Sequence, residues 1–147
     1  MNQSIRPVKN ALLAPGGLLA LAAFAPMQAA WAQRSSRIPF KPGSYGTMLS
    51  GSITGSEYID DKLTANQGQK MFVELAVRHP NGNGTMYFNM LSPGSTGEAI
   101  YIGPMNDARS TSVTLPTSGT YTIRVDLMGN DKDTGTTVGL ILDLSIQ

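Results

Sequence analysis

Side chains capable of acid–base or nucleophilic chemistry are scarce in this sequence. The 147 residues include one histidine, His79, and no cysteine. His79 stands in the segment RHPNGNG, whose proline, glycines and asparagines predict a turn that exposes the imidazole. A serine hydrolase would have to recruit that imidazole, and the chain contains no G-x-S-x-G motif. We therefore predict a protein that is not an enzyme and needs no cofactor.

Asp60 and Asp61 are adjacent carboxylates in the segment YIDDKLTA (58–65). A pair of carboxylates can serve a glycosidase when the two groups lie about 5 to 10 Å apart across one bond. Neighbouring residues on a strand point to opposite faces, so these two cannot share a substrate bond. The favoured interpretation is that one of them leans inward near a sheet edge and discourages aggregation.

The acidic segment MGNDKDTG (128–135) resembles the opening of a calcium-binding loop. Asp131, Asp133 and Gly135 match the pattern D-x-D-x-G, whose oxygens suit a hard cation. The twelfth position of such a loop holds a bidentate glutamate, but here it is Leu142. Asn130 and both aspartates are also common turn residues. A plain turn between two strands is therefore favoured, and a metal site at Asp131 and Asp133 is the weaker alternative.

Tyrosine and amide side chains near the predicted turns are candidates for binding. A tyrosine can stack on a sugar ring or anchor a protein partner, because one end is apolar and the other forms hydrogen bonds. Tyrosines also occur in strands for packing alone. Tyr58 is the strongest candidate of a group that comprises Tyr45, Tyr58, Tyr87, Tyr101, Asn81 and Asn83.

Short segments in which apolar and polar residues alternate recur about every ten residues along the chain. Met71, Val73 and Leu75, for example, share one face of KMFVELAVRH, and Glu74 lies on the other. Clusters of Gly, Pro, Asn and Asp separate these segments, which predicts an all-β antiparallel β-sandwich of about eight short strands. Strands are expected at residues 46–53, 58–65, 70–79, 85–91, 99–103, 110–115, 120–127 and 138–146. Alternation leaves the order of the strands open.

The first 32 residues have the pattern of a cleaved signal peptide. Arg6 and Lys9 precede an apolar run at 11–27, and Ala30 and Ala32 supply the small side chains that signal peptidase requires. Prolines and glycines interrupt the run, which is shorter than the roughly 20 residues of a membrane-spanning helix. We therefore expect a periplasmic or secreted protein without a membrane anchor.

Residues 33–147 are expected to form one domain, to judge from their number. With no cysteine, that domain must be held by packing and strand pairing rather than by disulfides. Residues 33–38 are expected to be mobile at its start, although Ile38 to Phe40 could pair as an extra edge strand.

The charge balance of this domain argues against nucleic acid as a partner. Removal of Arg6 and Lys9 leaves nine basic and ten acidic residues. The nine bases are scattered singly, whereas nucleic-acid binding requires clustered Lys and Arg side chains.

Several phrases occur in the order found in one protein family. LSGSITG, YIDDKLTANQGQ, YFNMLSPG, EAIYIG and LPTSGTYTIRV together resemble the bacterial periplasmic inhibitors of g-type lysozyme, over residues 40–146. A more distant resemblance is to the secreted β-sandwich domains at the C-termini of exported peptidases.

The closer resemblance implies a non-enzymatic β-sandwich that blocks a muramidase cleft with its loops. It also implies arginines in the loop that follows the LPTSGTYTIRV motif, but Lys132 is the only cation of that loop. Arg124 matches the family motif, although it could instead serve a cross-strand pair. The expected partner-binding residues are Tyr58, Asp60, Arg124, Asn130, Asp131, Lys132 and Asp133. The alternative is a carbohydrate- or peptidoglycan-binding module, or an accessory module of the peptidase C-terminal type.

Overall fold

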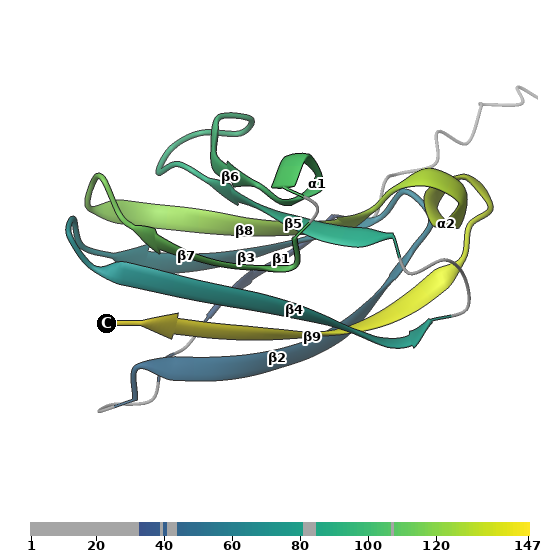
Figure 1. The fold of residues 1–147 in the computed structure, drawn as a ribbon, viewed down its shortest axis with the longest axis horizontal. Helices are drawn as coiled ribbons and strands as arrows, with labels where there is room; N and C mark the ends of the chain where they lie inside the picture. The colour runs from purple at the N-terminus through teal and green to yellow at the C-terminus, as the bar shows by residue number, and fades with distance from the viewer. Residues whose placement is uncertain (1–32, 39, 41–43, 81–84, 107) are drawn as a thin grey trace, which may run out of the picture.

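The computed structural model describes residues 33–38, 40, 44–80, 85–106 and 108–147, which form nine strands and two short helices. The strands are β1 (Gln33–Arg37), β2 (Gly46–Thr54), β3 (Tyr58–Ala65), β4 (Lys70–Pro80), β5 (Met86–Leu91), β6 (Ala99–Ile102), β7 (Ser110–Thr114), β8 (Gly119–Leu127) and β9 (Thr137–Ile146). The helices are α1 (Gly103–Asn106) and α2 (Gly129–Asp133). Two facing sheets make up the fold (Figure 1), so the prediction of an all-β sandwich is confirmed.

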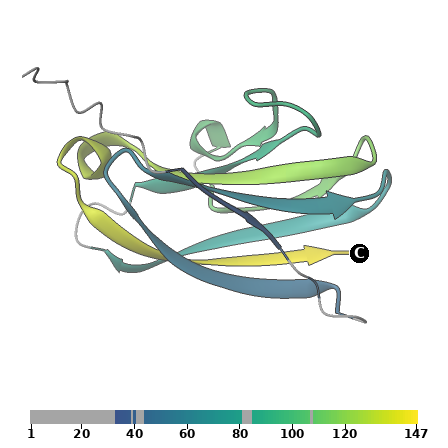
Figure 2. The ribbon, with the colours of Figure 1, turned by 180° about the vertical axis from the view of Figure 1, so that it is seen from behind.

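The chain alternates between the two sheets as it proceeds. One sheet has the strand order β1-β3-β8-β5-β6, and the other has the order β2-β9-β4-β7. Within the described strands, only β5 and β6 follow each other in one sheet, and every other connection crosses to the opposite sheet (Figures 1 and 2). Most of the predicted turns are therefore arches between the layers rather than hairpins.

The inner faces of the sheets pack together as the alternation predicted. Val73 of β4 and Leu142 of β9 are fully buried, as are the large rings of Phe88 and Tyr121. The Tyr121 hydroxyl donates to the carbonyl of Thr117 at 2.6 Å, which satisfies the polar end of this core residue. Burial of each large apolar side chain stabilises the fold by roughly 1.5–3 kcal/mol.

Residues 33–38, which were expected to be mobile, are mostly part of a sheet in this structure. Residues 33–37 form β1, which pairs with β3 in the one parallel ladder among the described strands (Figure 2). Ile38 is 5% exposed, and its amide donates to the carbonyl of Lys62 at 2.9 Å. The polar segment QRSSR has no apolar alternation, so only its non-local partner β3 reveals it as a strand. No helix in the described part has the length and apolarity to cross a membrane, and the predicted signal peptide lies outside the described residues.

Asp61 is buried on the inner face of β3. An inward-leaning carboxylate near a sheet edge was predicted, and Asp61 lies on the strand next to the edge strand β1, which covers it. Asp61 is 5% exposed and accepts a hydrogen bond from the Ser36 hydroxyl of β1. Burial raises the pKa of Asp61, although the Ser36 hydrogen bond and the charge of Arg34 oppose the shift.

Because its pKa is raised on folding, ionised Asp61 weakens the fold once the pH exceeds the folded-state pKa. Asp61→Asn retains an acceptor for Ser36 and removes that penalty. We expect the variant to melt about 3 °C higher at pH 7, and by a smaller margin at pH 3.5, which is below the ordinary aspartate pKa of 3.8, so that the carboxyl is mostly protonated in both states. Thermal unfolding followed by circular dichroism measures both differences. A variant that melts below the wild type at pH 7 would contradict this account of Asp61.

Candidate functional site

The outer surface of the five-stranded sheet gathers several of the predicted binding residues. β3, β8 and β5 lie side by side there, and their register aligns polar residues in rows. Tyr58, Asp126 and Tyr87 form one row. Asp60 and Arg124 face each other in the next row. We call these five residues the Arg124 face.

Arg124 is fixed by two charge-assisted hydrogen bonds. Its Nε and Nη2 atoms donate to the two carboxylate oxygens of Asp60 at 2.7 and 2.8 Å. The guanidinium carbon lies 4.5 Å from the centre of the Tyr58 ring, which is a cation–π distance. The hydrogen bonds that Arg124 donates to Asp60 raise the pKa of Arg124. Since 27% of the Arg124 side chain is exposed, against 4% for Asp60, a positioned positive charge reaches the surface.

Asp126 lies near Arg124 and lines a small hollow. The hollow has a volume of about 180 Å³ and is lined by Glu57, Tyr58, Arg124, Asp126 and Lys132, among others. Asp126 Oδ1 is buried and has no hydrogen-bond partner among the described residues. Burial raises the pKa of Asp126, and the charges of Lys132 and Arg124 oppose that shift. The lining of the hollow therefore combines two cations, Arg124 and Lys132, with the buried Asp126 Oδ1 that lacks a hydrogen-bond partner among the described residues.

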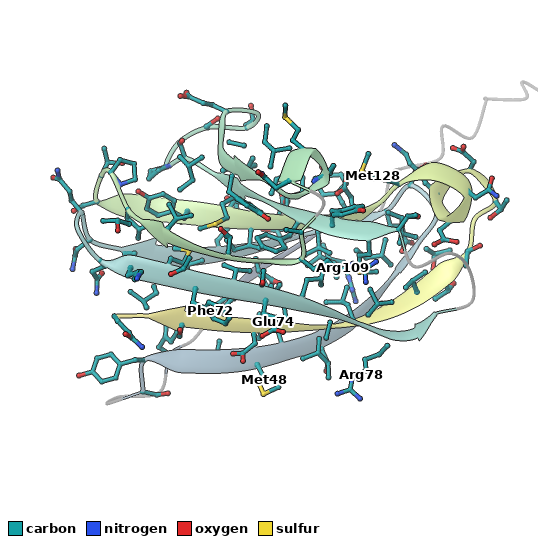
Figure 3. All side chains as sticks on the ribbon, viewed as in Figure 1. Met48, Phe72, Glu74, Arg78, Arg109 and Met128 are labelled. Carbon is teal, nitrogen blue, oxygen red and sulfur yellow. The ribbon has the colours of Figure 1, made fainter. Side chains whose placement is uncertain are left out.

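Helix α2 forms one wall of this hollow and is anchored by a buried carboxylate. Asp131 is 2% exposed, and its Oδ2 accepts from both the amide and the hydroxyl of Thr85 at 3.2 Å. The Met128 amide, next to α2 in Figure 3, donates to the carbonyl of Thr85 at 2.8 Å. These bonds attach the helix to the start of β5, and they leave Lys132 exposed at the surface.

The turn between β2 and β3 supports α2 from the other side. Gly55 has a φ of +56°, and its amide donates to the carbonyl of Thr136 at 3.0 Å. A Cβ at this position would lie 3.2 Å from the Cα of Gly135, so a glycine is needed for both reasons. This bond ties the segment after α2, the helix that carries Lys132, to the turn that leads into Tyr58.

Solved structures of three proteins match this architecture. PliG from Aeromonas hydrophila, a periplasmic lysozyme inhibitor of g-type lysozyme, is 31% identical, with a TM-score of 0.68 over 78% of this chain and 97% of that chain. This chain belongs to the PliG family. A mutant of Escherichia coli PliG-Ec is 26% identical, with a TM-score of 0.60 over 79% of this chain and 100% of that chain. Salmonella Typhimurium PliG has 20% identity and a TM-score of 0.59, with 78% and 98% covered, and supports the fold alone.

The PliG assignment confirms the resemblance inferred from the sequence. It also confirms the prediction of a non-enzymatic protein, because the matched proteins are inhibitors. No protein-family model and no curated protein matches the chain. The shared architecture, rather than any short motif, is therefore the strongest link to the PliG family.

The structure brings some of the predicted residues together and separates others. Tyr58, Asp60 and Arg124 are in contact, and Lys132 lines the same hollow. Asn130 and Asp133 are exposed on α2, whereas Asp131 is buried and cannot be touched from outside. Sequence reasoning missed Asp126, and the signal for it was its place on the polar face of β8, two residues after Arg124.

The predicted turn at 128–135 is instead the helical arch α2, because β8 and β9 belong to different sheets. Asp131 is engaged by Thr85, and Asp133 is exposed. No group of three or more His, Cys, Asp or Glu side chains able to hold a metal ion occurs in the described residues. The carboxylate of Asp131 thus has a structural explanation that needs no calcium.

The remaining candidate tyrosines, Tyr45 and Tyr101, lie apart from the Arg124 face. Tyr101 stacks on the core ring of Phe88 at 5.1 Å between ring centres. Tyr45 is 73% exposed but precedes β2 in the opposite sheet. Asn81 and Asn83 lie outside the described residues, as does the side chain of His79.

The Arg124–Asp60 pair should behave as a coupled unit. Arg124→Met leaves Asp60 buried without its cation, and we expect a loss of about 3 kcal/mol in the free energy of unfolding. The double variant Arg124→Met with Asp60→Leu removes both charges and should recover at least about half of that loss. Urea unfolding of the two single variants and the double variant measures the coupling. Additive losses would contradict the assignment of a stabilising pair.

Proposed function

We propose that this protein is a periplasmic inhibitor that binds a g-type lysozyme through the Arg124 face and helix α2. The observation that carries the proposal is the 31% identity and the near-complete coverage of Aeromonas hydrophila PliG. The predicted signal peptide is consistent with export to the compartment in which PliG acts.

The chemistry of the Arg124 face suits a lysozyme cleft. Glycoside hydrolases hold catalytic carboxyl groups in the substrate cleft, so a cation with directed N–H groups is a complementary ligand. Arg124 is already oriented by Asp60 and Tyr58, and this preorganisation lowers the entropy lost on binding. Lys132, the only cation of its loop, adds a second positive charge at the rim of the hollow.

A protein partner fits this surface better than a sugar does. Sugar recognition by stacking needs an open aromatic face, and the guanidinium of Arg124 covers one face of the Tyr58 ring. Two of the other candidate tyrosines are not available beside it, since Tyr101 stacks on Phe88 and Tyr45 precedes β2 of the opposite sheet. A partly exposed arginine that is oriented by a buried carboxylate is instead typical of an anchor in a protein interface.

A panel of lysozymes tests the proposed function. The purified periplasmic protein is added to g-type, c-type and i-type lysozymes, and the clearing of a cell-wall suspension is followed by turbidity. We expect the g-type enzyme to be slowed at micromolar inhibitor and the other two to be unaffected. If the g-type enzyme keeps its full rate at that concentration, the proposed function is wrong, although the fold assignment stands.

Two variants then locate the binding surface. Arg124→Lys keeps the charge and loses the bidentate hydrogen bonding to Asp60, so we expect it to weaken inhibition about tenfold. Arg78→Lys makes the same change on the outer face of the opposite sheet, where Arg78 is exposed (Figure 3), and should leave inhibition unchanged. Melting temperatures show that both variants are folded. Equal effects of the two substitutions would contradict binding through the Arg124 face.

A further inference from the structure

A second hollow lies between the two sheets, on the side that β1 closes. Its volume is about 430 Å³, within the range of small-molecule sites. Leu49 of β2, Ile59 of β3 and Leu140 of β9 give it an apolar wall, and Arg34 and Asp61 give it polar groups. Because Asp60 and Asp61 point to opposite faces of β3, this hollow is separate from the Arg124 face.

Asp61 offers this hollow a carboxylate oxygen that the protein does not use. Oδ1 accepts from the Ser36 hydroxyl, and no other hydrogen bond reaches the Asp61 side chain within the described residues. The residue is only 5% exposed, yet it lines the hollow. A buried carboxylate with a spare acceptor is unfavourable by itself, so it is suited to a ligand that brings a donor or a positive charge.

Arg34 places the opposite charge at the same hollow. Its Nη2 atom donates to the carbonyl of Ser52 at 2.8 Å, which fixes the guanidinium across the gap between β1 and β2. A Cβ on Gly51 would lie 3.1 Å from that Nη2 atom, so the glycine makes room for the arginine. A guanidinium has five N–H donors, and the bond to Ser52 leaves the others for a ligand acceptor.

We propose that this hollow binds a small zwitterion, namely an α-amino acid with an aliphatic side chain. The ammonium group of the ligand pairs with Asp61, and its carboxylate pairs with Arg34. The aliphatic side chain packs against Leu49, Ile59 and Leu140. The site is independent of the lysozyme-binding surface, and its failure would leave the proposed function intact.

The probe for this site is L-leucine, titrated into the isotope-labelled periplasmic protein and followed by NMR. At about 10 mM leucine even a millimolar site is mostly filled, so saturable shifts are expected at the methyl groups of Leu49, Ile59 and Leu140. Isopentylamine and 4-methylpentanoate each lack one of the two charges and should bind at least about tenfold more weakly. An absence of saturable shifts at these methyl groups would overturn the proposal, since the hollow would then hold only water.

Matched variants of β1 and β3 separate a binding role from a structural one. Asp61→Asn and Arg34→Gln should each weaken leucine binding about tenfold or more. Arg37→Gln removes the same charge from the opposite face of β1, where Arg37 is aligned with the exposed Lys62, and should bind leucine like the wild type. Asp61→Asn is expected to melt above the wild type, so unfolding cannot explain its loss of binding. Undiminished binding by Asp61→Asn would contradict the assigned role of the carboxylate.

Discussion

The pairing of Asp60 with Arg124 across β3 and β8 is the interaction on which the rest of the structure depends. Asp60 is 4% exposed, and the observed register places the Arg124 guanidinium in hydrogen-bond contact with its carboxylate. A slip of β3 by one residue would turn Asp60 toward the core and expose Ile59 and Leu63. The ion pair is therefore formed only when Ile59 and Leu63 face the core and Asp60 faces outward.

The same register gives two consecutive residues of β3, Asp60 and Asp61, different structural roles. Asp60 faces outward and orients Arg124 over Tyr58, while Asp61 faces inward and accepts from Ser36 of β1. The outer face then carries a cation that is held rigidly against its neighbours. The inner face carries an acid whose environment disfavours its charge. One strand thus contributes to a site with an exposed cation on the outer face and to a site with a buried acid on the inner face.

Sequence patterns predicted the parts of the fold that repeat locally. The core residues of β4, β8 and β9 follow from alternation, and the cross-strand role considered for Arg124 is confirmed by its bonds to Asp60. What was missed depends on distant partners. β1 has no apolar pattern and becomes a strand through β3, and Asp131 is structural because Thr85 lies 46 residues earlier in the chain. The order of strands was beyond prediction for the same reason, since nearly every connection changes sheet.

Family membership and local chemistry together make the Arg124 face the centre of the functional account. Amide hydrogen exchange of this protein, alone and saturated with a g-type lysozyme, tests that claim most directly. We predict slower exchange in the complex at residues 56–60 and 124–133, which contain Tyr58, Arg124 and α2. The amides of β2 and β7, the edge strands of the opposite sheet, should exchange as in the free protein. Protection confined to those two strands, with none at residues 124–133, would contradict the account.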